Sequence, residues 1–215
     1  MALTLYFHPL SSYCQKALIA LYENGTAFTP HFVDLMDPAA RAAFMKIWPI
    51  GKFPVLHDDA GDRTIPESSI IIEYLARHYP GPSALVPADP DRARQTRMRD
   101  RFFDNYVMTP MQKLVFDRMR PEGKADPYGV EEAKALMARA LDLIEPEMAT
   151  KRWAMGDDFT MADCAAAPAL FYADMQMPFG ATHPNTAAYL ARLRERPSYA
   201  RALREAEPYL ARVPR

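Results

Sequence analysis

The chain has 215 residues, a formal net charge of −1 at pH 7, 49% hydrophobic residues and 25% charged residues. This length suits one large domain or two small ones with a substantial core. The near-neutral charge excludes a long-range field that would gather nucleic acid or an anionic membrane, so we expect neither as a partner.

The cysteine count and the N-terminal residues bear on the compartment. Two cysteines, Cys14 and Cys164, are too few and too far apart in sequence for a disulfide framework or a thiolate metal site, so no metal is expected. No apolar run approaches the roughly 20 residues that cross a bilayer. The first six residues lack the basic region and apolar core of a signal peptide. These features predict a cytoplasmic protein.

The first third of the chain mixes strand and helix patterns. Leu3, Leu5 and Phe7 alternate with polar or aromatic neighbours, which predicts a strand. The following patterns predict, in chain order, a helix over 13–24 closed by Gly25, a strand over 28–35, a short helix over 39–46, a strand over 54–57, a short strand ending at 65 and a helix over 67–79. This order predicts one sheet with helices packed against it.

A proline-rich stretch separates this part from the rest. Residues 80–90 contain four prolines and a glycine and cannot continue a helix. We therefore expect a first domain over 1–80, a linker over 81–91 and a second domain over 92–215. In the second domain every long segment has helical periodicity, with helices expected over 92–118, around 136–148, over 161–174, around 190–193 and over 199–210.

Three features of the second domain carry specific expectations. Pro110 should kink the first helix. The arginines between 92 and 101 alternate with Asp91, Asp100 and Asp104, which predicts a solvated helix face. Thr160 and Asp163 have the spacing of a capping box, and the apolar helix that follows is expected to be buried.

Four motifs together resemble one family. They are residues 5–21, Gly51-Lys52-Phe53-Pro54-Val55-Leu56, the segment 66–75, and Thr160-Met161-Ala162-Asp163. In this order and spacing they resemble the cytosolic glutathione transferases over nearly the whole chain. The resemblance implies an α/β, thioredoxin-like N-terminal domain followed by an all-helical domain, glutathione as co-substrate, and a homodimer. One departure is Trp48, where many members carry Asn.

The resemblance also implies which residues bind glutathione. Ser68, at the start of a predicted helix, would take the γ-glutamyl carboxylate, as helix N-termini favour anions. Glu67 would help to hold the ammonium group, and Lys52 would meet the glycyl carboxylate. Phe53 would pair its backbone with the cysteinyl unit beside a cis Pro54. From the residues alone, Ser68 could equally be a helix cap, Lys52 a surface lysine and Pro54 an ordinary trans proline.

Three residues compete for the role of activating the glutathione thiol. Aligned with serine-type and zeta-like members, Ser11 occupies the catalytic serine position, whereas alignment with beta-like members selects Ser12. Ser12 and Gln15 have capping-box spacing, which would commit the Ser12 hydroxyl to the helix and leave Ser11 as the free donor. Cys14 is a true thiol, but free cysteines are more often buried than reactive. We therefore rank Ser11 first, then Ser12, then Cys14.

The expected function is a glutathione transferase that activates the thiol as a thiolate for attack on a small apolar electrophile. The electrophile should lie between the domains, along the helix over 92–118. The apolar residues Phe102, Phe103, Tyr106, Met108 and Met111 of that helix fit the core better than a pocket. The alternatives are a zeta-like isomerase, a glutathione-dependent reductase or peroxidase acting through Cys14, and a non-catalytic binding module.

Overall fold

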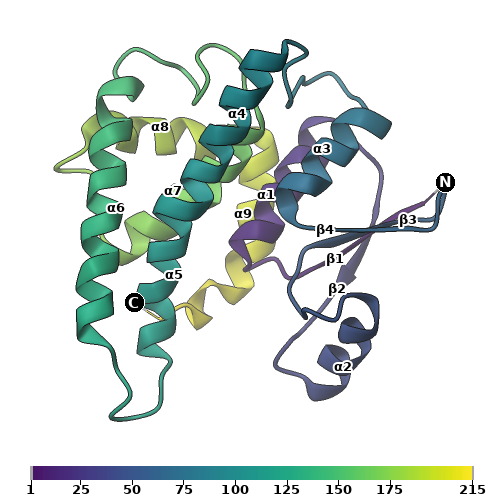
Figure 1. Ribbon diagram of the computed structural model, residues 1–215, viewed down its shortest axis with the longest axis horizontal. Coiled ribbons are helices and arrows are strands. Elements are labelled where there is room, and N and C mark those ends of the chain that lie inside the picture. Colours follow the sequence, from purple (N-terminus) through teal and green to yellow (C-terminus); the bar gives the residue numbers. More distant parts are fainter. Residues whose placement is uncertain (1, 215) are drawn as a thin grey trace.

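A βαβ unit followed by a ββα unit builds the N-terminal sheet in the computed structural model, which describes residues 2–214. The first unit comprises β1 (Leu3–Phe7), α1 (Ser12–Glu23) and β2 (Thr29–Phe32), and α2 (Pro38–Ile47) connects it to the second. The second unit comprises β3 (Val55–Asp58), β4 (Arg63–Pro66) and α3 (Ser68–His78). The strand order is β2-β1-β3-β4, with β2 parallel and β3 antiparallel to β1 (Figure 1). The predicted thioredoxin-like domain is confirmed.

The burial of each strand follows its place in the sheet. Leu3, Leu5 and Phe7 of the central strand β1 are buried, as their alternation predicted. The edge strand β2 is exposed along its length and is shorter than the predicted strand over 28–35. The strand is shorter than predicted because β2 lies at the edge of the sheet and pairs with β1 alone. An exposed edge strand is not held along its length by a continuous apolar pattern.

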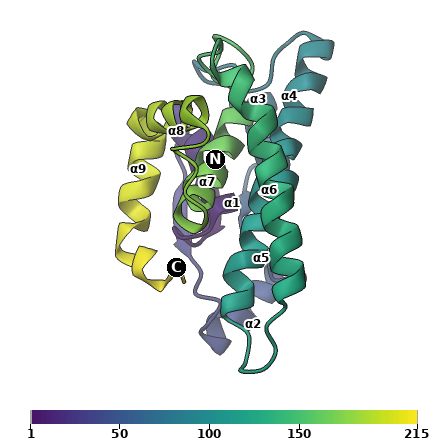
Figure 2. The ribbon, with the colours of Figure 1, turned by 90° about the vertical axis from the view of Figure 1, so that its left-hand side faces the viewer.

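The second half of the chain is helical, as predicted. It contains α4 (Pro90–Phe102), the π-helical segment η1 (Phe103–Met108), α5 (Thr109–Arg118), α6 (Pro127–Met148), α7 (Met161–Gln176), α8 (Pro184–Glu195), α9 (Pro197–Ala206) and the 3₁₀ segment η2 (Glu207–Arg212). Figure 2 shows α7 between α9 on one side and the layer of α4, α5 and α6 on the other. Most of α7 is buried, which confirms its prediction as a central helix.

The hydrogen-bonding pattern of the helix changes just before Pro110, the residue expected to kink it. Directly before it the helix turns π-helical, and the N–H of Thr109 donates to the carbonyl of Asp104, five residues earlier. Because proline lacks an N–H and crowds the preceding turn, the backbone widens there. The structure therefore divides the predicted helix over 92–118 into α4, η1 and α5.

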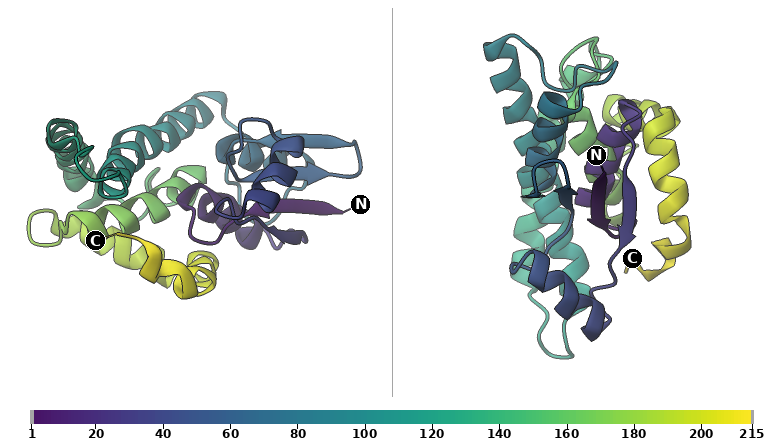
Figure 3. Two further views of the ribbon diagram at one scale, coloured as in Figure 1. Left: turned by 90° about the horizontal axis from the view of Figure 1, so that it is seen from below. Right: turned by 90° about the vertical axis from the view of Figure 1, so that its right-hand side faces the viewer.

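The two halves share one apolar core. Helix α1 of the sheet part packs on α7, and a single buried cluster runs from β1 through α1 to η1, α6 and α7. Residues 79–89, which connect α3 to α4, contain neither helix nor strand. Figure 3 shows the sheet part and the helical part side by side along this shared boundary.

Candidate functional site

The loop between β1 and α1 carries the three residues predicted to activate a thiol. Ser11 is the N-cap of α1, and its Oγ accepts a hydrogen bond from the N–H of Cys14 at 3.3 Å. Ser12 is the first helical residue and is buried. The prediction that Ser12 caps the helix with Gln15 as its box partner is therefore wrong. The side chain of Gln15 instead donates to the carbonyl of Pro9 at 2.9 Å and to the hydroxyl of Tyr172 at 3.1 Å.

The correction leaves the chemistry of Ser11 intact. A capping hydroxyl uses its oxygen as an acceptor, so the Ser11 proton can be donated either to the Cys14 sulfur, whose pKa Ser11 lowers, or to a bound ligand. Ser11 is half-buried at the N-terminus of α1, where the positive end of the helix dipole also favours an anion.

Cys14 is fully buried in the core, so its expected structural role is confirmed. Burial raises the pKa of its thiol to about 12, with hydrogen bonds from Ser11 and His8 opposing this only in part. The thiol therefore stays protonated at neutral pH, which disfavours Cys14 as a reactive thiolate.

The second group of predicted residues lies in the turn before β3. The Phe53–Pro54 peptide bond is cis, as predicted. The ring of Phe53 stacks on that of His8, with centroids 6.2 Å apart, which brings this turn beside the loop that carries Ser11. Among residues 2–214, no backbone hydrogen bond engages the N–H or C=O of Phe53. Lys52 is exposed on the same turn.

The start of α3 forms the third group. Glu67 has φ +70° and ψ 120°, a region that L-residues rarely adopt. It holds the N-cap position, yet no side chain caps the helix. Ser68 follows at the first helical position and is buried. Strain of this kind, at a helix start whose amides lack a side-chain acceptor, is typical of a ligand site.

Tyr13, which sequence reasoning did not include, links these groups to the helical half. Burial, followed by the negative charge of Asp104, raises the pKa of Tyr13 to about 12, and Glu67 acts in the same direction. Thr109 is its hydrogen-bond partner. Tyr13 therefore stays protonated at neutral pH and stands between the start of α3 and the junction of η1 with α5.

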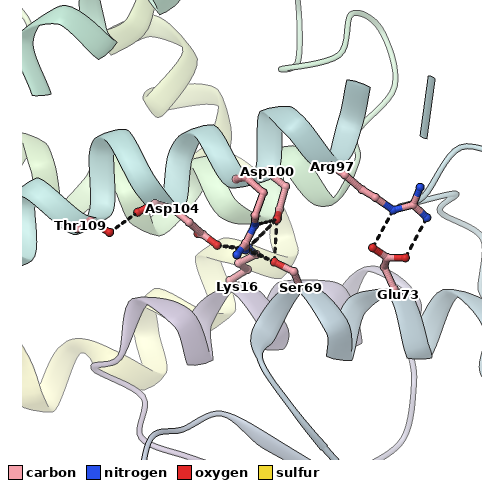
Figure 4. A network of polar contacts seen from close by, with 8 residues as sticks. Lys16, Ser69, Glu73, Arg97, Asp100, Asp104 and Thr109 are labelled. Carbon is pink, nitrogen blue, oxygen red and sulfur yellow. Dashed lines mark hydrogen bonds and ion pairs between the residues drawn. The ribbon is translucent and has the colours of Figure 1, made fainter. Parts of the chain in front are cut away.

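A buried ion cluster, also missed, joins α1, α3, α4 and η1 (Figure 4). The Lys16 ammonium of α1 lies 2.7 Å from Asp100 and 2.7 Å from Asp104, and it donates to Ser69 at 2.8 Å. Lys16, Asp100 and Asp104 are each at most 4% exposed, so the prediction of a solvated face is wrong for both aspartates. The four-residue spacing of the aspartates puts them on one helix face, and Lys16 stands alone in an apolar helix. Those two signals together could have revealed the pair.

Models of two protein domain families match the chain. Residues 5–83 match the glutathione S-transferase N-terminal domain, and residues 127–192 match the glutathione S-transferase C-terminal domain. Glutathione S-transferase F10 of Arabidopsis thaliana is 31% identical over 189 residues, which cover 85% of each protein. The chain belongs to the glutathione transferase family. This membership and the observed fold agree with the resemblance of the four sequence motifs.

Other relatives extend the comparison within the glutathione transferase fold. A stringent starvation protein A homolog of Coxiella burnetii is 29% identical over 217 residues, covering 98% of this chain and 96% of that protein. The crystal structure of a glutathione S-transferase from Methylobacterium radiotolerans, in complex with glutathione sulfonate, superposes with a TM-score of 0.82 at 29% identity and covers 94% of both chains.

The apolar residues named on the predicted helix over 92–118 divide between core and surface. Phe102, Phe103, Met108 and Met111 are buried in the core, as their periodicity favoured, and Tyr106 is exposed. A surface hollow of about 300 Å³ lies between α5 and α6, and its lining includes none of the predicted site residues. The groups that approach Tyr13 from the helical half are instead Arg101, Asp104 and Thr109.

Two searches of the described residues found nothing. Within residues 2–214, no cluster of three or more His, Cys, Asp or Glu side chains could hold a metal ion. None of the helices that the structure describes combines the length and apolar character needed to span a membrane.

Proposed function

We propose that this protein binds glutathione at the start of α3 and the Phe53 turn, and that the Ser11 hydroxyl stabilises the glutathione thiolate. The observation that carries the proposal is the position of Ser11. Its Oγ caps α1 as an acceptor, which leaves the hydroxyl proton as a donor beside the Phe53 turn.

The three groups suit the different parts of glutathione. The uncapped amides of α3 and the Ser68 hydroxyl suit the γ-glutamyl carboxylate, and the exposed carboxylate of Glu67 suits the ammonium group. The backbone N–H and C=O of Phe53 suit the cysteinyl unit as an added strand. Lys52 suits the glycyl carboxylate as a mobile point charge.

The chemistry that follows is conjugation. A free thiol has a pKa of about 8.5, and a hydroxyl donor together with a helix N-terminus favours its anion. The thiol proton leaves to solvent, and the thiolate sulfur then forms a bond to an electrophilic carbon. In a substitution this carbon expels a leaving group with the bonding electron pair; in an addition the resulting anion takes a proton from water. One charge-assisted hydrogen bond is sufficient to lower the thiol pKa by about one to two units.

Three substitutions test the role of Ser11. Ser11→Ala removes both the cap and the donor, whereas Ser11→Gly removes the donor and keeps an acceptable N-cap residue, at a cost of only a few tenths of a kcal/mol in stability. We expect both variants to stay on immobilised glutathione and to conjugate an aromatic halide about tenfold to a hundredfold more slowly at neutral pH. Ser12→Ala is the matched control and should retain its rate. Equal losses in the Ser11 and Ser12 variants would contradict the assignment.

A non-catalytic binding module is the alternative of another class. The full-length similarity to a protein named as a stringent starvation protein A homolog, and not as a transferase, favours this second candidate. Wild-type protein that binds glutathione but turns over no electrophile would support it. The reductase and peroxidase alternatives lose support because the Cys14 thiol is buried with a raised pKa.

We also propose a homodimer, in line with the family resemblance. Ile70 of α3 and Met98 of α4 are both about half-exposed apolar side chains. Light scattering coupled to size-exclusion chromatography would give the mass directly, and a mass of about 24 kDa, that of one chain, would contradict the dimer.

A further inference from the structure

The loop that carries Ser11 is held by polar side chains from α1, from α7 and from the loop itself. The carbonyl of Pro9 accepts from Gln15 of α1 at 2.9 Å, and the carbonyl of Leu10 accepts from the Tyr172 hydroxyl of α7 at 2.7 Å. The N–H of Leu10 donates to Nδ1 of His8 at 3.1 Å, and the N–H of Ser11 donates to the carbonyl of His8 at 3.0 Å. The backbone on the N-terminal side of Ser11 is thus fixed at four points.

Of the three side chains that hydrogen-bond to this loop, His8, Gln15 and Tyr172, only that of His8 changes its charge near neutral pH. Gln15 does not titrate, and burial raises the pKa of Tyr172, which keeps its hydroxyl a donor. A backbone N–H can donate only to an imidazole nitrogen that carries no proton, so neutral His8 has its proton on Nε2. Protonation places a second proton on Nδ1, facing the N–H of Leu10, and this hydrogen bond is then lost.

The surroundings of His8 keep water away from the ring. Its ring packs on Phe32 and Tyr209, with centroids 4.9 Å and 5.0 Å away, and it also stacks on Phe53. Tyr209 belongs to η2, so the C-terminal part of the chain covers the same ring that braces the Ser11 loop. Two charged groups face His8 from different elements. They are Asp34, directly beyond β2, and Arg212 of η2.

The effects of these two charges on the pKa of His8 partly cancel, and burial has the largest effect on it. It lowers the pKa of His8 below its ordinary value of 6.5; Asp34 opposes this change and Arg212 adds to it. The neutral form therefore prevails at pH 7, and the hydrogen bond from Leu10 is lost only as the pH falls through this lowered pKa.

We propose that neutral His8 is a positioning residue for Ser11: its Nδ1 holds the Leu10 N–H and thereby aims the Ser11 hydroxyl. This inference rests on the proposed function of Ser11. It predicts that two ionisations lower the conjugation rate as the pH falls, that of the glutathione thiol and that of His8. As the pH falls through the pKa of His8, the rate of the wild type should drop by about a further tenfold beyond the first-power fall that the thiol ionisation causes.

Two variants of His8 distinguish the effect of losing the Nδ1 acceptor from the effect of losing the titrating group. His8→Asn places an amide oxygen near the position of Nδ1 without a titrating group, and His8→Phe keeps a ring without an acceptor. We expect His8→Phe to lose about tenfold in rate at every pH, the value of one hydrogen bond of about 1.4 kcal/mol, and His8→Asn to recover most of that loss at pH 7. In His8→Asn the acid limb should fall with the first power only. His78→Asn, an exposed histidine in the last turn of α3, is the matched control and should keep the further tenfold drop.

Nitrogen NMR of the wild-type ring gives a readout that needs no activity and no variant. The nitrogen shifts should show His8 with an unprotonated Nδ1 at pH 7. A protonated Nδ1 at pH 7, or an unchanged acid limb in His8→Asn, would overturn the proposal. Full activity in Ser11→Ala would instead overturn the proposed function, so the two failures are distinguishable.

Discussion

The starts of α7 and α3 are two buried helix N-termini that the chain treats in opposite ways. At α7 the Asp163 carboxylate accepts from the N–H of Thr160 and the N–H of Ala154, each at 2.8 Å, and from the Tyr189 hydroxyl at 2.6 Å. At α3 the N-cap residue Glu67 is held at φ +70° and no side chain caps the helix. Where the chain supplies its own acceptors, the terminus stabilises the fold. Where it supplies none, the terminus is suited to an external carboxylate.

The largest effect on stability is expected from removing the Asp163 carboxylate at the start of α7. Asp163→Ala leaves several buried donors without an acceptor, so we expect the free energy of unfolding to fall by about 4 kcal/mol. Denaturant titration followed by circular dichroism measures it. Thr160→Val removes one hydroxyl and keeps the backbone N–H, and it should cost only about 1 kcal/mol. Equal losses in the two variants would contradict the dominant role of the carboxylate.

The buried charge between α1, α3 and α4 should give the next largest effect. Lys16→Met leaves Asp100 and Asp104 buried with only the half-exposed Arg101 as a cation, and we expect a loss of about 3 kcal/mol at pH 7. Burial already raises the pKa of Asp104, and Lys16 is the main group that opposes this rise. Without Lys16 that pKa rises further. Since the folded state then binds its proton more tightly than the unfolded state, the loss should shrink as the pH falls through this raised value.

A surface ion pair provides the control for that cluster. Lys134 and Glu131 lie on exposed faces of α6, 2.7 Å apart. Lys134→Met should change the free energy of unfolding by less than about 0.5 kcal/mol at any pH. A loss in Lys16→Met that is equally small, or one that grows at low pH, would contradict the buried pair as a stabilising contact between the domains.

The same contrast explains which features could be predicted from the sequence. The capping box of α7 and the central burial of that helix were predicted because both depend on residues within one short segment. The start of α1 was not, because Ser11 and Ser12 are both good caps and the choice depends on where β1 ends. Gln15 and Tyr172 meet only in the folded chain, 157 positions apart in sequence. Lys16 and its aspartates, on α1 and on α4 and η1, are also far apart in sequence, although the spacing of the aspartates and the isolated lysine were signals that could have suggested them.

The smallest effect is expected at the start of α3, and its sign is the informative part. Glu67→Gly relieves a backbone conformation that costs a non-glycine residue about 1 to 3 kcal/mol. Glycine also gives the unfolded chain more freedom, which costs about 1 kcal/mol. We therefore expect the free energy of unfolding to stay level or to rise by up to about 2 kcal/mol, while retention on immobilised glutathione weakens. Glu67→Ala keeps the strain and loses the same carboxylate, so it should weaken retention equally without any gain in stability. A stability loss in Glu67→Gly would show that the Glu67 side chain supports the fold, and the proposed division between a structural terminus at α7 and a ligand-binding terminus at α3 would then be wrong.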